Sequence, residues 1–498
     1  MSANSSFSVQ RRPEICLLSN DQRHRIHMAA LDVLERTGVR FLEPEAVELL
    51  RGAGADITDQ TLVRIPSSLV EEALRSAPKR IVIYNRNGGP ALFLEGHNVY
   101  FGTGSDLPNT IDPFSGRRRQ SKKQDIGDAV LLCDYLSNID FVMSMGIASD
   151  VDSVTADRHH FEQMISNTTK PIIFTASNLD GLADIYEMCI AVAGDAESFR
   201  RTPFAIHYAE PTTPLRHTVE ATQQLLFCAE KGIPLVYVSG PSMGASAPVT
   251  IAGAVVLSMA EFLSGLVVSQ LKRKGASIIC GGGSSPMDMR TTTFSYAAPE
   301  NWLDEIAVRE MATYYGLPVF GEGGVSDAKL FDQQAALEVA ITLMLVGLSG
   351  TNLIHDVGYL ESGVTACYEA IILSNEVIGE IKRFLKGVEV TEETLAVDVI
   401  NRVGPGGNFL IDKHTVKLFK KEVWYPEYLD RQNYDGWRKS GGKSLGETLN
   451  ARVKWILENH YPEPLEPSIR QAIREIVERS GAGGRSVKRG PNPKRSRK

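Results

Sequence analysis

The residues of this chain that are able to do chemistry follow short apolar segments. Six such groups combine acids, imidazoles, aromatics and glycines: Thr103 and Asp106; His207, Tyr208 and Glu210; Tyr237, Ser239, Ser242 and Met243; Gly281 to Ser285 with Asp288 and Arg290; Glu322, Asp327 and Lys329; His355, Asp356, Tyr359 and Glu361. If the apolar segments are parallel strands, their carboxyl ends bring all of these groups to one edge of the sheet. This edge is acidic and aromatic, and its glycines let another group approach the backbone closely.

Metal-dependent and covalent chemistry fit these residues poorly. A catalytic metal needs several ligands at suitable spacing, whereas His207 and His355 stand alone on different segments, as structural histidines usually do. Schiff-base chemistry needs a lysine inside a dry strand, and Lys329 lies beyond its apolar segment. Zinc-assisted transfer to a thiol needs paired cysteines, but Cys280 is followed by glycines. We therefore expect no bound metal.

An acidic and aromatic edge suits a small organic cation. A quaternary ammonium is already activated for loss of a methyl group, because the leaving group departs as a neutral amine. Aromatic faces hold such a cation by cation–π attraction, and carboxylates complement its charge. Core packing is the alternative role for each aromatic residue near the strand ends. The candidates for substrate binding are Tyr208, Tyr237, Tyr296, Trp302 and Tyr359.

The elements that must position these residues form a repeating pattern. Eight apolar segments occupy residues 98–104, 140–148, 171–177, 203–210, 234–240, 277–283, 317–324 and 351–359. A helical stretch follows each segment, and the starts lie roughly 30 to 45 residues apart, which is typical of β-α units. Eight units predict an α/β protein with a (β/α)8 TIM barrel. The alternative is a doubly wound sheet, but FGTGSD after the first segment lacks the third glycine of its phosphate-binding motif.

The regions on either side of the barrel differ from it in pattern. Residues 1–97 predict an N-terminal α+β cap, with helices beginning near Asn20, Pro44 and Pro66 and a hairpin around Asn87 to Gly89. Residues 98–386 form the predicted catalytic barrel. Residues 387–479 predict a C-terminal α/β extension packed on the barrel, with helices near 443–459 and 467–479. Residues 480–498 are basic and rich in glycine and proline, which indicates a disordered tail.

Composition excludes several functional classes. The chain has 498 residues, 43% hydrophobic and 23% charged, and a formal net charge of −7 that argues against nucleic acid as a partner. Its six cysteines have no C-x-x-C spacing and no secretory signal precedes them, so we expect a cytoplasmic protein. The apolar stretch from Ile251 to Leu271 carries Glu261 at its centre, which favours a buried helix over a membrane span.

Several long segments resemble the trimethylamine methyltransferase (MttB-type) family. They are HMAALDVLERTGVRF, IPSSLVEEALRSAP, GGGSSPMDMRT followed by Ala298-Pro299-Glu300, YYGLPVFGEGGVSDAKLFDQQAALE and NLIHDVGYLESG, in the same order as in the family. The resemblance spans essentially the whole chain. It implies a homo-oligomeric barrel enzyme that transfers a methyl group from an amine to the Co(I) corrinoid (cobalamin) of a separate carrier protein, with no tightly bound cofactor of its own.

The resemblance also assigns provisional places to the site residues. Gly281, Gly282, Gly283, Ser284 and Asp288 would lie where corrinoid and substrate meet, and His355, Tyr359 and Glu361 would line the opposite wall. Catalytic roles then fall to Asp288, His355, Glu210 and His207. The last three would shape the pocket, contact the corrinoid, or remove the proton of a tertiary amine.

The trimethylamine enzymes of methanogens carry pyrrolysine in the barrel, whereas this sequence contains only standard residues. Members without pyrrolysine are associated with quaternary amines, so we expect glycine betaine or a similar substrate, with trimethylamine as a second possibility. Arg290 would pair with the betaine carboxylate or, alternatively, form a surface ion pair. Two other functions stay open: a non-catalytic barrel that binds betaine or a corrinoid protein, and an unrelated barrel lyase or decarboxylase.

Overall fold

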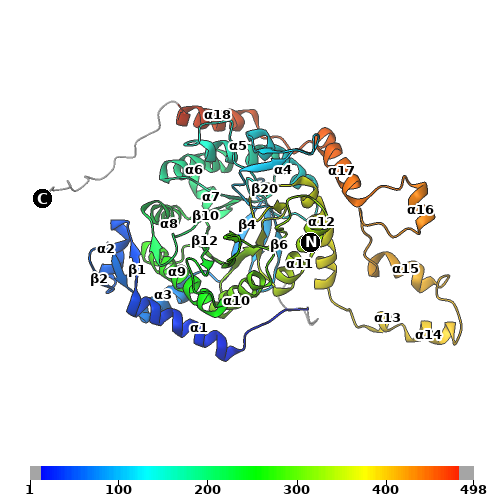
Figure 1. Cartoon of the computed structure of the whole chain (residues 1–498), viewed down its shortest axis with the longest axis horizontal. Coiled ribbons are helices and arrows are strands. Elements are labelled where there is room, and N and C mark those ends of the chain that lie inside the picture. The colour runs from blue at the N-terminus through cyan, green and yellow to red at the C-terminus, as the bar shows by residue number, and fades with distance from the viewer. Residues whose placement is uncertain (1–12, 482–498) are drawn as a thin grey trace.

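The computed structural model describes residues 13–481 and has a parallel β-barrel at its centre (Figure 1). Seven strands pair in the order β6-β18-β17-β14-β12-β10-β9, and every neighbouring pair is parallel. The strands are β6 (Tyr100–Phe101), β9 (Ile172–Phe174), β10 (Ala205–Ala209), β12 (Leu235–Ser239), β14 (Ile278–Gly282), β17 (Val319–Glu322) and β18 (Leu353–His355). Each lies inside one of the predicted segments.

The remaining predicted segment, residues 140–148, closes the barrel. Phe141 bridges in parallel to Gly102, directly after β6, and Val142 bridges in parallel to Ile172 at the start of β9. The edges of the seven-stranded sheet are thereby joined through residues 141–142. This segment pairs too briefly to form a regular strand, but it removes both free edges. The (β/α)8 prediction is confirmed and the doubly wound alternative is wrong.

Helices surround the barrel, one after each strand segment (Figure 1). They are α4 (Lys123–Tyr135), α5 (Ala156–Asn167), α6 (Leu179–Ala193) followed by the short α7 (Ala196–Arg201), α8 (Val219–Lys231), α9 (Ile251–Lys272), α10 (Pro299–Tyr315), α11 (Gln333–Ser349) and α12 (Tyr368–Leu385). Short strands in the strand-to-helix loops form small separate sheets: β7 (Asn109–Ile111), β8 (Arg118–Gln120), β13 (Ser242–Met243), β15 (Ser285–Asp288), β16 (Thr293–Phe294), β19 (Tyr359–Leu360) and β20 (Thr365–Ala366).

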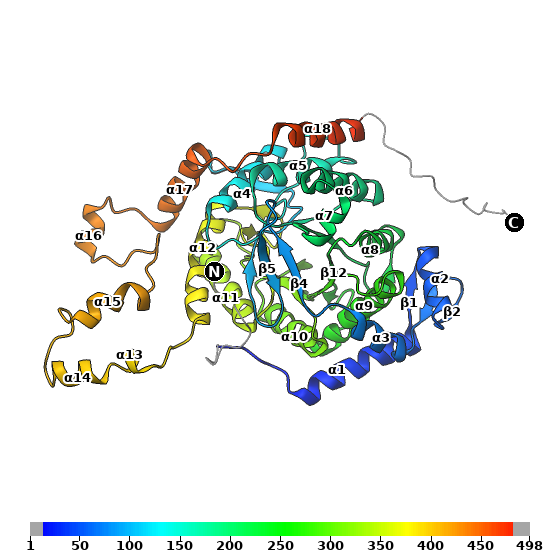
Figure 2. The same ribbon diagram turned by 180° about the vertical axis from the view of Figure 1, so that it is seen from behind.

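A hairpin closes the amino end of the barrel. The antiparallel pair β4 (Ile81–Tyr84) and β5 (Pro90–Leu94) lies across this end in Figure 2. Its buried side chains, among them Ile83 and Leu92, pack in one apolar cluster with inward side chains of the barrel strands such as Ile206 and Phe320. The opposite, carboxyl end of the barrel is left for the polar residues that follow the strands.

The N-terminal elements cover the outer face of α9. They comprise α1 (Asn20–Asp32), the π-helical turn η1 (Val33–Thr37), α2 (Pro44–Gly52), α3 (Ser67–Ser76) and a small sheet of β1 (Val39–Phe41), β2 (Asp56–Thr58) and β3 (Leu62–Arg64) with β11 (Arg216–His217). Helices α1, α2 and α3 all pack on α9, which explains why most of this helix is buried although it is apolar all round. It is a core helix, as its sequence predicts.

The C-terminal extension is helical throughout the described residues. It consists of α13 (Glu392–Leu395), α14 (Val397–Val403), α15 (Lys413–Glu422), α16 (Tyr434–Lys439), α17 (Leu445–Asn459) and α18 (Pro467–Gly481). The two helices predicted near 443–459 and 467–479 are present, whereas the predicted α/β character is wrong. A closed barrel offers no free strand edge, so the extension finds no sheet to join. The predicted tail lies outside the described residues from 482 onward.

Candidate active site

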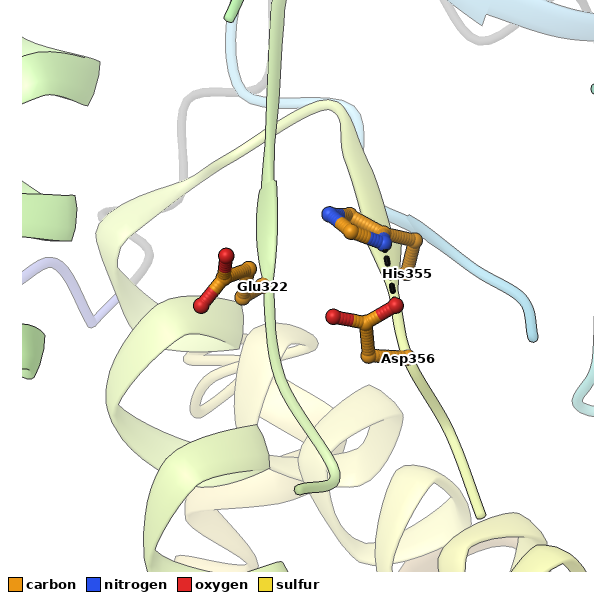
Figure 3. Close-up of side chains that lie close together, drawn as sticks. All are labelled: Glu322, His355 and Asp356. Atoms are coloured by element: carbon orange, nitrogen blue, oxygen red, sulfur yellow. Dashed lines mark ion pairs between the residues drawn. The ribbon is translucent and has the colours of Figure 1, made fainter. Parts of the chain in front are cut away.

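Inward-pointing residues at the ends of β17 and β18 form the centre of the candidate site. Glu322 ends β17, His355 ends β18 and pairs with Glu322 in register, and Asp356 follows directly (Figure 3). His355 Nδ1 lies 2.5 Å from Asp356 Oδ1, and one ligand atom from each of the three residues lies within 4.8 Å of the others. The imidazole also stacks on the ring of Phe320, with centroids 4.1 Å apart, which fixes its orientation.

Asp356 has an unusual backbone conformation for its residue type. Its φ is +76°, in the left-handed region, and its side chain is buried beside His355. Such a conformation costs of order 1 kcal/mol or more and persists where the surroundings enforce it, which is common at functional sites.

Acidic groups crowd around Glu322 without balancing cations. Burial, and then the nearby Asp356 carboxylate, raise the pKa of Glu322 to about 7, while His355 and the Asn301 side chain act in the opposite direction. Burial raises the pKa of Asp304 to about 8 and raises that of Glu305 well above its usual range. Glu322 Oε2 and Asp304 Oδ1 are buried without a hydrogen-bond partner in the described part of the chain. A cation placed here would relieve this crowding.

Two glycines make room for Glu305, which reaches the strand ends from α10. A Cβ on Gly283 would overlap the Glu305 carboxylate, and so would one on Gly321. The backbone N–H of Glu322 donates to Glu305 Oε2 over 3.2 Å. The glycine run after β14 therefore lets a helix carboxylate enter between β14 and β17.

Aromatic and acidic side chains extend the site beyond the central trio. Tyr208 points into the barrel from β10, and its hydroxyl donates to Glu210 Oε2 over 3.3 Å. Glu210 is exposed in part, yet surrounding protein atoms desolvate its carboxylate and raise its pKa. Tyr296 feels the charges of Glu322, Asp356 and Glu210, which add to burial in raising its pKa.

Trp302 and Tyr359 support this region without opening onto it. The Trp302 indole donates to the carbonyl of Tyr296 over 3.3 Å and so holds the loop that carries Tyr296. Tyr359 is buried, and its hydroxyl donates to the carbonyl of Ser105. Both residues lie close to the predicted site, but their contacts are those of positioning residues.

His207 and Tyr237 lie on the outer side of their strands, away from the central trio. His207 is fully buried on the outer face of β10, where its ring nitrogens meet the Phe174 carbonyl and Gln224 Oε1 at 3.2 Å each, and burial lowers its pKa to about 4. Tyr237 is buried on the outer face of β12, where its hydroxyl meets His217 Nδ1 at 2.7 Å. Neighbouring residues on a strand face opposite sides, so Tyr208 and His207 cannot both face the interior.

Asp288, Arg290 and Glu361 form ion pairs that do not include the central trio. Asp288 ends β15, and it pairs with Arg290 at 3.0 Å; the Arg290 side chain is 89% exposed. This is the surface ion pair that the sequence left open for Arg290, and the Arg290 guanidinium lowers the pKa of Asp288. Glu361 pairs instead with Arg118 at 2.8 Å and accepts from Thr365. These contacts occupy all three side chains away from the central trio.

The residues predicted to meet the corrinoid serve the packing of the barrel. Gly281 and Gly282 are buried in β14, and a Cβ on Gly281 would meet Val238. Ser284 is buried; its N–H donates to Asp304 Oδ2 over 2.7 Å. Of the four, Gly283 lies beside the acidic cluster, through Glu305. Gly282 and Ser284 face the helices α9 and α10, so the role predicted for them at the corrinoid stays a prediction.

Three further residues near the site were not predicted from the sequence, because they lie on a helix and not at a strand end. Asn301, Asp304 and Glu305 are buried on α10, and they share a face with Val308 and Ala312. Their spacing of three and four residues is that of an apolar stripe. The sequence signal for them was the presence of two acids and an amide at positions that face the protein interior, because buried carboxylates are rare unless they have a role.

The fold and the site define a (β/α)8-barrel protein with a cluster of acidic and aromatic side chains at the carboxyl ends of its strands. The trimethylamine methyltransferase (MTTB) family model matches residues 2–484. The chain therefore belongs to the trimethylamine methyltransferase family, and so to the methyltransferases. This membership argues against the alternative of an unrelated barrel lyase.

Individual relatives agree with the family over nearly full length. The chain is 33% identical over 461 residues to the trimethylamine methyltransferase MttB of Desulfitobacterium hafniense (strain DSM 10664 / DCB-2), covering 92% of this chain and 93% of the relative. It is 30% identical over 478 residues to the glycine betaine methyltransferase of Desulfitobacterium hafniense (strain Y51), covering 95% and 98%. The crystal structure of the Methanosarcina barkeri monomethylamine methyltransferase MtmB shares the fold, with a TM-score of 0.51, 13% identity and coverage of 90% and 89%.

Proposed function

We propose that this chain removes a methyl group from a small methylated amine and passes it to the Co(I) corrinoid of a separate carrier protein. A quaternary amine such as glycine betaine is the favoured substrate, and trimethylamine is the alternative. The observation that carries the proposal is the group of buried carboxylates around Glu322 that lacks balancing cations.

The electrostatics favour a cationic ligand. Three carboxyl groups with raised pKa values lie together, and each would ionise more easily beside a permanent positive charge. A quaternary ammonium cannot donate a hydrogen bond, so it needs charge and aromatic faces rather than aligned acceptors. Tyr208 and Tyr296 supply rings near Glu322 and Glu210.

Catalysis by the chain is then chiefly positioning. The carboxylates hold the ammonium, the tyrosines restrict its orientation, and one methyl group points away from the cluster toward the carrier. The corrinoid, when brought by its carrier, would supply the cobalt nucleophile that accepts the methyl group, and the amine nitrogen keeps the electron pair of the broken C–N bond and becomes neutral. With a protonated tertiary amine, the His355–Asp356 pair is placed to take up the proton.

The choice between the two substrates rests on the sequence and on the relatives, since the acidic cluster suits either amine. The sequence contains only standard residues, and a relative at 30% identity is a glycine betaine methyltransferase, while relatives at 33% and 34% are trimethylamine methyltransferases. Arg290 is committed to Asp288, so it gives no support for binding a betaine carboxylate. A bound betaine would direct its carboxylate away from the acidic cluster.

The same trio of side chains has the composition of a metal site. Glu322, His355 and Asp356 offer two oxygens and one nitrogen within 4.8 Å, which would suit Zn²⁺ or another divalent ion. A divalent ion would repel a cationic substrate from this cluster, so the two occupants are exclusive there. We propose the organic cation as the occupant.

The test is a methyl-transfer assay with metal analysis. The purified chain is incubated with a reduced corrinoid carrier protein and, separately, with glycine betaine, trimethylamine and choline, and methyl-Co(III) formation is followed by absorbance. We expect turnover with at least one amine, unchanged by EDTA, and a loss of at least tenfold in Glu322→Gln. Metal bound in stoichiometric amount, with activity abolished by EDTA, would overturn the cation-site proposal. Tight amine binding without methyl-Co(III) would favour the non-catalytic barrel.

The cellular setting belongs to the same proposal. All six cysteines are unpaired and α9 is packed inside the protein, in keeping with a cytoplasmic enzyme. The proposed partners are the amine, the corrinoid carrier protein and further copies of the chain, with no role for nucleic acid or membrane.

A further inference from the structure

The Asp327 carboxylate joins loops from three consecutive β-α units at the carboxyl end of the barrel. Asp327 itself lies in the loop between β17 and α11. From the loop that precedes α10 it accepts the Ser295 hydroxyl at 2.5 Å and the backbone N–H groups of Tyr296 and Ala297 at 3.1 and 3.4 Å. From the loop between β19 and β20 it accepts the Ser362 hydroxyl at 2.8 Å. Loops of the sixth, seventh and eighth units therefore meet at one carboxylate.

The backbone around Asp327 is tied to the helix that follows it. The N–H of Asp327 donates to Glu338 Oε2 over 2.9 Å, and the same oxygen accepts from the Ser326 hydroxyl at 2.6 Å. Glu338 belongs to α11, so these bonds connect the loop to the helix layer. The N–H of Ser362 also donates to the carbonyl of Ser326 over 3.2 Å. Asp327 is thus a fixed attachment point for the loops on both sides.

Tyr296 is the aromatic residue of the candidate site that these contacts hold. Its N–H donates to Asp327, while its carbonyl accepts from Asn301 Nδ2 at 3.2 Å and from the Trp302 indole at 3.3 Å. The ring lies against Gly363, where a Cβ would come within 2.8 Å of ring atom Cε2. Gly363 has a φ of +78°, so space and backbone conformation both favour glycine there.

Asp327 supplies one of the two backbone attachments of Tyr296. The segment has no regular structure of its own, since β16 ends at Phe294 and α10 begins at Pro299. Without the Asp327 carboxylate, the carbonyl side of Tyr296 stays bound to α10 but the N–H side loses its acceptor. A cation–π contact requires the cation over the ring face, within about 6 Å of its centroid. A ring with one free attachment does not keep that geometry.

We propose that Asp327 is a positioning residue for amine binding, because it holds the Tyr296 ring beside the acidic cluster. The inference rests on the proposed function, since it takes Tyr296 as part of the amine site. The ammonium loses its positive charge as the methyl group leaves, so the ring binds the ground state at least as strongly as the transition state. Loss of Asp327 therefore raises the KM for the amine and leaves kcat nearly unchanged.

The first test measures the position of the ring without an activity assay. The ligand-free protein is treated with tetranitromethane, and nitration of each tyrosine is followed by peptide mass spectrometry. Burial and the acidic cluster raise the pKa of Tyr296, so the wild type reacts slowly there. We expect Asp327→Ala to be nitrated at Tyr296 roughly fivefold faster or more, because the loop opens locally. The rate at Tyr461, which is 82% exposed, should stay the same.

Asp332→Ala is the matched control. Asp332 also accepts from two backbone N–H groups next to α11, but it caps that helix and does not contact the Tyr296 loop. It should keep the wild-type nitration rate at Tyr296. Circular dichroism checks folding of every variant. If Asp327→Ala does not fold, Asp327→Asn takes its place, because an amide keeps one acceptor oxygen and we expect a smaller change in the same direction.

The second test measures kinetics in the methyl-transfer assay. We expect Asp327→Ala to raise the KM for the amine roughly fivefold or more with kcat within about twofold, and Asp332→Ala to change neither. An unchanged nitration rate at Tyr296, an unchanged KM, or a fall in kcat at constant KM would each overturn the proposal. A wild type that demethylates no amine would overturn the proposed function and the role in amine binding together. Faster nitration in Asp327→Ala would then still show that Asp327 holds Tyr296.

Discussion

At the scale of single residues, the site is defined by buried carboxyl groups whose pKa values are raised and which form no ion pair with a lysine or arginine among the described residues. Glu322 is the clearest case, because its pKa near 7 places its ionisation in the physiological range. His207 is the opposite case: its hydrogen bonds and burial make it a neutral structural residue. Residue type alone does not separate the two, whereas the direction of each side chain does.

Glu322 should make amine binding depend on pH. The cation binds the ionised carboxylate, so affinity should rise as the pH increases through about 7. Isothermal titration of a quaternary amine between pH 6 and 8.5 measures this, and Glu322→Gln should weaken binding and flatten the pH profile. Glu361→Gln, at an acid that pairs with Arg118, is the control and should leave the profile unchanged. An unaltered profile in Glu322→Gln would place the cation elsewhere.

The same substitution should stabilise the ligand-free protein. The pKa of Glu322 is raised in the folded state, so the wild type loses stability as the pH rises from about 4.5 to about 7. Glutamine stays neutral and avoids this loss, by up to roughly 3 kcal/mol at pH 8. Chemical denaturation at pH 5 and pH 8 gives the comparison. A variant that is less stable than wild type at pH 8 would contradict the assigned pKa.

Two tyrosines near strand ends should separate catalysis from stability. Tyr208→Phe removes the donor to Glu210, and we expect a higher KM for the amine with little change in stability. Tyr237→Phe removes the partner of His217 and should cost roughly 1–3 kcal/mol with unchanged kinetics per folded molecule. Steady-state assays and denaturation curves on both variants measure this. Equal kinetic effects would mean that the inward and outward assignment is wrong.

At the scale of elements, the strand–loop–helix unit around β14 and α10 builds most of the acidic cluster. Helix α10 carries Asp304 and Glu305, and Gly283 after β14 and Gly321 in β17 leave room for the Glu305 carboxylate. The glycine run is therefore explained by a side chain that approaches from the helix layer. No external ligand is needed to account for it.

Alanine at Gly283 should disturb the site, while alanine at Gly282 should not. A Cβ at position 283 overlaps the Glu305 carboxylate, whereas one at position 282 meets its nearest atom, the Ser239 carbonyl oxygen, at an ordinary 3.4 Å. We expect Gly283→Ala to lose about 1–3 kcal/mol of stability and most activity. The loss should be smaller in the background of Glu305→Ala, where the overlap is absent. Additive losses in this double-mutant cycle would contradict the proposed role of the glycine.

Periodicity predicts the elements well and the site only in part. The eight apolar segments identify the barrel because each strand buries both faces, and the capping patterns place α1, α2 and α3 within a residue or two. Strand alternation already contained the outward direction of His207 and Tyr237, since Ile206 and Val236 must face the interior. The stripe positions of Asp304 and Glu305 indicate that they are buried, but their approach to β14 could not be predicted because nothing local fixes how α10 meets that strand.

At the scale of the whole molecule, apolar surfaces of the barrel and of its helices are covered by further elements of the chain. The barrel is closed below by the β4–β5 hairpin, and α9 is covered outside by the N-terminal helices. Residues 388–421, which contain α13, α14 and α15, instead keep ten large apolar side chains exposed in the described structure.

The N-terminal cover of α9 should be necessary for a stable fold. Leu34 is fully buried in η1, which packs against α9, so Leu34→Ala should cost about 2–5 kcal/mol and expose apolar surface. Met28 lies on α1 nearby and is 49% exposed, which makes Met28→Ala the matched control, with a change below about 0.5 kcal/mol. Thermal unfolding and binding of an apolar dye measure both effects. Equal stability of the two variants would mean that the N-terminal elements contribute little to stability and that packing on the barrel alone stabilises α9.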